Sequence, residues 1–207
     1  MSRPGLNVRL LIGLVCLLVL PLVSGAKNPS EYAKLLADLK AGNTNIDYAR
    51  LRMSYVDSPE RKKAKDTTAE EKAMSQALQS KDFAGALKDA ESVLDQQYVN
   101  MDAHFVAFVA ERELGDAAKA DFHRTVFRGL IDSIRNSGDG KSPEKAWVVI
   151  SVHEEYVVLR ALGLRPSGQS LVGQNGHMYD VMKAKDEDGN EETFYFNTDI
   201  PMKDEKF

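Results

Sequence analysis

A change of residue pattern at Gly138-Asp139-Gly140 constrains the fold of this chain more than any other feature. Before it, over residues 69–136, apolar side chains recur at helical spacing. After it come short runs rich in β-branched and aromatic residues, which are typical of strands. Segregated helices and strands indicate the α+β class. We therefore predict one α+β domain over residues 27–207. Its helical part covers 27–136, and a small, mainly antiparallel sheet with one helix covers 146–201.

The helical part contains two segments that can be laid over each other, "SKDFAGALKDAESVLDQQYVN" and "ELGDAAKADFHRTVFRGLIDS". In this overlay Asp82 matches Asp116, and Ala86 matches Ala120. The pattern loosely resembles tetratricopeptide helix pairs, in which small residues permit close helix contact. Only about two units are present, fewer than a free-standing solenoid usually needs. We expect helix hairpins within a domain, preceded by a solvated, charge-dense loop over residues 60–71.

The sheet part begins with "AWVVIS" (146–151), predicted as a buried strand. "VHEEYVVLRALG" (152–163) is predicted as a helix with Tyr156 on its apolar face, so Tyr156→Ala should cost about 3 kcal/mol. Three further strands are predicted, and an acidic, glycine-containing hairpin turn over 186–191 joins the last two. The strands are "QSLVG" (169–173), "HMYDVMKAK" (177–185) and "ETFYFN" (192–197).

The N-terminus has the pattern of a cleavable secretory signal. Arg3 and Arg9 precede an apolar run over residues 10–23, and small residues follow as far as Ala26. The run is shorter than the roughly 20 residues of a membrane-spanning helix. We predict cleavage after Ala26, export to the periplasm or beyond, and no integral membrane span afterwards. An uncleaved anchor is the alternative.

Composition excludes several function classes for the exported chain. The only cysteine, Cys16, lies within the signal, so disulfides, thiolate zinc sites and cysteine nucleophiles are excluded after cleavage. The signal holds two of the 27 basic residues and none of the 31 acidic ones, which leaves a formal net charge of −6. Because nucleic-acid binding needs a basic surface, we expect no nucleic-acid partner.

The familiar chemical motifs are incomplete. Gly140-Lys141-Ser142 resembles the end of a phosphate-binding loop, but Arg135 stands where the first glycine is required. We interpret this stretch as a helix-ending connector, with Ser142 capping the turn that follows. The acidic stretch at 186–192 is too short for a calcium loop, because Gly189 is its fourth residue and not its sixth.

His153-Glu154-Glu155 lacks the second histidine of a zinc protease helix, since Val157 occupies that position. Distant histidines remain possible partners in three dimensions, namely His104, His123 and His177. No Gly-x-Ser-x-Gly elbow occurs. We therefore assign no catalytic residue, no metal site and no cofactor.

Five segments together resemble the bacterial family known as domain of unknown function 4919, over about residues 30–201. They are "MDAHFVAFVAERELGDAAKADFH", "SGDGKSPEKAWVVISVHEEYVVLRALGL", "GQSLV", "GHMYDVM" and "FYFNTDIP". The resemblance implies an exported bacterial α+β protein and brings no activity, cofactor or catalytic residue with it. Its polar features mark a place to look for a site.

The sequence leaves two functions open, with a purely structural domain as the third. The preferred one is an exported binding module for an envelope protein or a small ligand. The rival is a hydrolase or metal-dependent enzyme with a site at the helix–sheet junction. The candidate binding residues are Asp139, His153, Glu154, Glu155, Tyr156, His177, Tyr179 and Asp180, of which His153, Glu154, Glu155, His177 and Asp180 would serve the enzyme.

Overall fold

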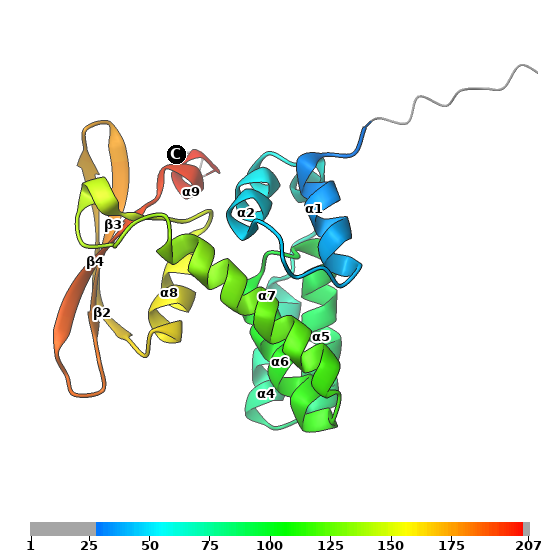
Figure 1. Cartoon of the computed structure of the whole chain (residues 1–207). Coiled ribbons are helices and arrows are strands. Elements are labelled where there is room, and N and C mark those ends of the chain that lie inside the picture. Colours follow the sequence, from blue (N-terminus) through cyan, green and yellow to red (C-terminus); the bar gives the residue numbers. More distant parts are fainter. Residues whose placement is uncertain (1–27, 205–207) are drawn as a thin grey trace, which may run out of the picture.

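The computed structural model describes residues 28–204, with helices first and strands last (Figure 1). This order confirms the α+β prediction. The predicted signal lies outside the described residues. Within residues 28–204, no helix is both long and apolar enough to cross a membrane.

Three short helices open the described chain: α1 (Glu31–Lys40), α2 (Tyr48–Val56) and α3 (Pro59–Lys63). The third overlaps the stretch 60–71 that was predicted as a loop, so that prediction was wrong over residues 60–63. Ser58 caps α3 by accepting a hydrogen bond from the backbone N–H of Arg61, and Pro59 occupies its first position. A capping serine followed by proline favours a helix start even without apolar periodicity.

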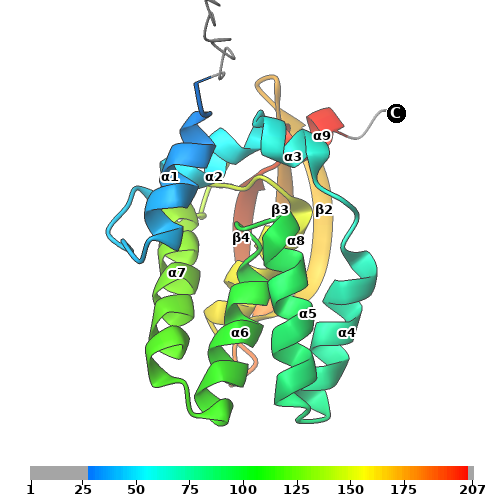
Figure 2. The same cartoon turned by 90° about the vertical axis from the view of Figure 1, so that its right-hand side faces the viewer.

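Two helix hairpins form the bulk of the helical part. They are α4 (Thr68–Gln79) with α5 (Phe83–Gln96), and α6 (Met101–Leu114) with α7 (Ala117–Arg135); Figure 2 shows them side by side. The overlaid residues have matching roles. Asp82 and Asp116 cap α5 and α7, and Ala86 and Ala120 are buried where the helices touch. The predicted hairpins are therefore confirmed.

The sheet has the strand order β1-β4-β3-β2, with β1 parallel to β4 and the other pairs antiparallel. The second strand is longer than predicted. The first is much shorter, because the N–H of Ile150 is bonded to the carboxylate of Glu154 and not to a neighbouring strand. The elements are η1 (Pro143–Lys145), β1 (Trp147–Val148), α8 (Val152–Ala161), β2 (Arg165–Gln174), β3 (His177–Lys185), β4 (Glu191–Asn197) and α9 (Asp199–Asp204).

The connector between α7 and β1 contains the Gly-Lys-Ser stretch. It forms the 3₁₀ turn η1, whose preceding residue Ser142 makes no side-chain cap. The cap predicted for Ser142 is therefore absent, although the turn itself is present.

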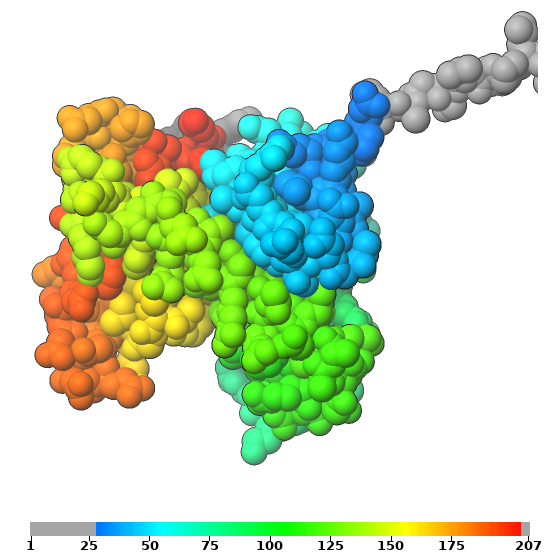
Figure 3. All heavy atoms as spheres, viewed as in Figure 1, coloured from blue at the N-terminus to red at the C-terminus, as the bar shows by residue number. Residues whose placement is uncertain are grey.

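Helix α8 lies between the sheet and the helical part (Figure 1). One core cluster joins the two parts, because Leu130 and Ile134 of α7 belong to the same cluster as Val158 of α8 and Phe196 of β4. Below this contact the molecule is hollowed between the sheet and the ends of the hairpins (Figure 3).

The prediction for Tyr156 was wrong, because its side chain is 37% exposed. The buried positions of α8 are instead Glu154, Glu155, Val157, Val158 and Leu159. This helix is packed on two sides, against the sheet and against α6 and α7. The spacing of apolar residues in the sequence therefore predicts the wrong buried face for α8.

Candidate functional site at the helix–sheet junction

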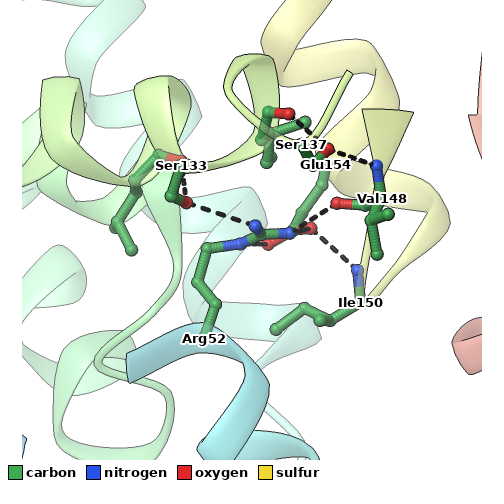
Figure 4. A network of polar contacts seen from close by, with 8 residues as sticks. Arg52, Ser133, Ser137, Val148, Ile150 and Glu154 are labelled. Atoms are coloured by element: carbon green, nitrogen blue, oxygen red, sulfur yellow. Dashed lines mark hydrogen bonds and ion pairs between the residues drawn. The ribbon is translucent and has the colours of Figure 1, made fainter. Parts of the chain in front are cut away.

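A buried ion pair joins the two parts of the fold. The guanidinium of Arg52 donates from Nε to Glu154 Oε1 at 3.0 Å and from Nη2 to Oε2 at 2.5 Å, with side chains only 2% and 5% exposed. Figure 4 shows that Ser133 and the backbone of Val148 accept the remaining Arg52 hydrogen bonds, and that Ile150 N–H donates to Glu154. Glu154 is therefore fully engaged in holding α2 to α8.

A second bridge lies at the surface of the same junction. Asp102 of α6 accepts hydrogen bonds from His153 Nε2, at 2.8 Å, and from the guanidinium of Arg160. Burial acts to raise the pKa of Asp102, but the hydrogen bond from His153 and the charge of Arg160 outweigh it and lower that pKa. The same hydrogen bond raises the pKa of His153, and this makes a protonated, cationic imidazole easier to form.

A pocket of about 470 Å³ opens beside these two bridges, and we call it the junction pocket. Its wall combines the ends of α2 and α3, the turn before α4, the loop before α6, and the start of α8. The polar side chains that line it are Arg61, Lys65, Asp66, Glu71, Gln97, Asn100, Ser151, His153 and Glu154. Two of the predicted residues, the sequence neighbours His153 and Glu154, line this pocket.

Glu155 and Asp180 form a different, buried arrangement on the inner face of the sheet. Neither Glu155 oxygen has a hydrogen-bond donor within residues 28–204, and the side chain is fully buried. Burial and the neighbouring Asp180 carboxylate raise the pKa of Glu155 to about 9. Glu155 is thus protonated at neutral pH, and the charge of Asp180 favours this proton. Gln169 donates to Asp180 at 2.7 Å and accepts from the Tyr156 hydroxyl at 2.5 Å.

The other predicted residues lie elsewhere. His177 contacts Asp199 at 2.6 Å, beside α9. Tyr179 is buried and adjacent to His177, on the strand face opposite to Asp180. Asp139 is exposed in the connector and pairs with Lys145 at 3.4 Å. The junction candidates therefore divide into separate clusters, and no group of three metal-ligating side chains converges within residues 28–204.

Sequence reasoning missed a histidine pair between α6 and α7, in which His104 is fully buried and His123 is partly buried. His104 Nε2 donates to the Tyr98 carbonyl at 2.9 Å, so His104 Nδ1 accepts from His123 Nδ1 at 2.8 Å. The Nε2 atom of His123 lies 3.9 Å from Glu111 Oε1. Burial lowers the pKa of His104 to about 3 and that of His123 to about 4, and it raises that of Glu111 to about 7. The two histidines are 19 residues apart, and only the turn of the hairpin brings them together.

Comparison with known proteins gives one match. The model of a family described as domain of unknown function (DUF4919) matches residues 26–206. No curated protein and no solved structure matches the chain.

Proposed function

The chain belongs to the domain of unknown function 4919 family, and we propose that it is an exported binding module whose ligand occupies the junction pocket. The observation that carries this proposal is the pocket itself. Its volume of about 470 Å³ lies within the usual range of ligand sites. Polar side chains from both the helical part and α8 converge on it, as expected for a site that orients a small molecule.

The acidic residues of the pocket wall already have partners. Glu154 is paired with Arg52, and Glu71 accepts hydrogen bonds from Thr67 and Asn100. These carboxylates are therefore poorly available to a ligand cation.

Asp66, the third acid, accepts from the backbone N–H and the hydroxyl of Thr68. The Lys65 ammonium, in contrast, makes no ion pair within residues 28–204, and the Ser151 hydroxyl caps no backbone group. Donors and positive charge therefore remain for a ligand.

The N-terminus of α8 lies at the wall of the pocket. A helix N-terminus favours anions, and His153, whose pKa is raised, lies in its first turn. We infer a small ligand with a carboxylate or phosphate group, held by Lys65, Ser151 and His153.

A thermal-shift screen with inorganic phosphate, citrate, succinate and free amino acids tests this inference. At least one anion should raise the melting temperature of the full chain, and Lys65→Ala should abolish the rise. Lys72→Ala is the matched control, because Lys72 is exposed on α4 and does not line the pocket. The proposal fails if no anion shifts the wild type, or if both variants respond like the wild type.

A hydrolase is the second candidate, and one contact favours it. His153 is oriented by the carboxylate of Asp102, and Ser151 lines the same pocket. A carboxylate, an imidazole and a hydroxyl are the components of a hydrolytic triad. A fluorophosphonate probe should label Ser151 if this candidate is right, and Ser151→Ala should remove the label. An unlabelled wild-type protein excludes a serine hydrolase of this kind.

Export is supported by the basic residues, the apolar run and the small residues before position 27. Intact mass measurement of the protein from its source envelope should give a chain that begins at Lys27. A chain that retains residues 1–26 would support the uncleaved anchor instead.

A further inference from the structure

Strand β2 is an edge strand that nothing covers within the described chain. It pairs with β3 on one side only, and all ten of its residues, Arg165–Gln174, are exposed. Figure 2 shows it as the outermost strand of the sheet. An edge of this length presents a row of unpaired backbone donors and acceptors, which is a template for another strand.

The usual protection of an edge strand is confined to one end of β2. Pro166 and an irregular register between Pro166 and Gly168 interrupt the beginning of the strand. Residues 168–174 pair regularly with β3 and contain no charged side chain. Leu171 and Val172 are 49% and 39% exposed there. Proteins that avoid edge pairing place lysine or other charges at such positions.

We propose that β2 forms a homodimer interface, in which it pairs antiparallel with β2 of a second copy. A partner strand must be extended and free along one edge, and β2 of a second copy meets both conditions. Because residues 168–174 carry no charge, two copies of this segment do not repel each other. Antiparallel pairing also places the two Arg165 side chains at opposite ends of the interface, where they do not repel each other. The result is one continuous sheet across a two-fold axis, the commonest symmetry of soluble dimers.

The regular segment 168–174 is centred on Leu171. The two-fold axis of the proposed dimer therefore passes between the two copies of this residue. Directly opposed residues of an antiparallel pair lie on the same face of the sheet. The two Leu171 side chains therefore meet, and this apolar contact removes their exposed surface from water. Val172 would lie opposite Ser170 of the second copy on the other face.

The mass of the full chain in solution, measured by light scattering, is the first test. We expect twice the chain mass of 23.0 kDa. Leu171→Lys should weaken the dimer by at least about tenfold, because like charges would then be directly opposed. Leu114→Lys is the control, since Leu114 is 53% exposed at the end of α6, away from the sheet. A monomeric wild type, or a dimer that both variants leave intact, overturns the proposal.

Disulfide trapping locates the axis even if Leu171→Lys folds poorly. In a chain with Cys16→Ser, an added cysteine is the only one. Leu171→Cys should form a cross-linked dimer under mild oxidation, because disulfides need Cα atoms within about 7 Å. Gln174→Cys, which is far from the axis on the same strand, should remain uncross-linked. Equal cross-linking at both positions, or none at Leu171→Cys, contradicts the predicted pairing.

Discussion

The guanidinium of Arg52 and the carboxylate of Glu154 form a doubly hydrogen-bonded ion pair in the interior, between α2 and α8. Both charges are removed from water. Further hydrogen bonds to Ser133 and to the backbone satisfy the donors and acceptors that the pair itself does not use. Such a pair sets the orientation of one part of the fold against the other, and Glu154 also lines the junction pocket.

Removal of one partner of this pair should be costly. Arg52→Met should lower the free energy of unfolding by about 3–5 kcal/mol, because it leaves the Glu154 carboxylate buried without its counter-charge. The double variant Arg52→Met, Glu154→Leu should lose much less. Urea denaturation measures both. Arg50→Ala on the same helix breaks only an exposed pair with Glu31 and should cost less than about 1 kcal/mol. A double variant that is no more stable than the single one would contradict this account.

Glu155 should make stability fall as the pH rises. Its pKa is about 9 in the folded protein against an ordinary 4.5, so the folded state binds more protons than the unfolded state between these values. The contribution of Glu155 to stability is therefore complete below its ordinary pKa of 4.5 and is lost progressively as the pH rises to about 9, by at most about 1.4 kcal/mol per pH unit. Glu155→Gln should remove this slope, whereas Glu187→Gln in the exposed β3–β4 turn should keep it. Urea denaturation of the wild type and the two variants at about pH 5, 6.5 and 8 measures how the free energy of unfolding changes with pH. Equal slopes in wild type and Glu155→Gln would show that Glu155 is already ionised.

Three histidines, His104, His123 and His153, should titrate in two groups. His104 and His123 have pKa values of about 3 and 4, against an ordinary 6.5, because burial disfavours their charged form. Unfolding would let them bind protons, so they lower stability as the pH falls from 6.5 towards 4. His153, held by Asp102, should take up its proton above the ordinary value. Nitrogen-detected NMR of the imidazoles, with His153→Ala for assignment, resolves the groups. Protonation of His123 already near pH 6.5 would refute the burial argument.

Tyr156 and Leu159 should differ sharply in their contribution to stability. Tyr156→Ala removes an exposed ring and one hydrogen bond to Gln169, so a loss of about 1 kcal/mol or less is expected. Leu159 is completely buried three residues later, and Leu159→Ala should cost about 2–5 kcal/mol. Thermal and urea unfolding of the two variants decide the matter. Similar losses of stability for the two variants would show that Tyr156 is packed in the core.

The elements of the fold were predictable because their signals are local. The capping residues Ser30, Asp82 and Asp116 lie next to the helices that they start, and each accepts a hydrogen bond from a backbone N–H of the first turn. Residues two apart share a face of a strand, and Met182 of β3 and Phe194 of β4 are directly paired on the buried face of the sheet. The errors arose where local pattern competes with packing, as on α8, whose two packed sides leave Tyr156 outside the core.

The sequence by itself determined the fold class with helices before strands, the helix hairpins and the family of the chain. Only the tertiary structure decided which polar residues act together. Arg52 meets Glu154 across 102 residues, and Asp102 meets His153 across 51. Periodicity and capping report neighbours within a few positions along the chain. Contacts at such separations depend instead on how the helices and sheet pack, so the junction pocket, the buried Glu155–Asp180 pair and the uncovered β2 edge emerge only in three dimensions.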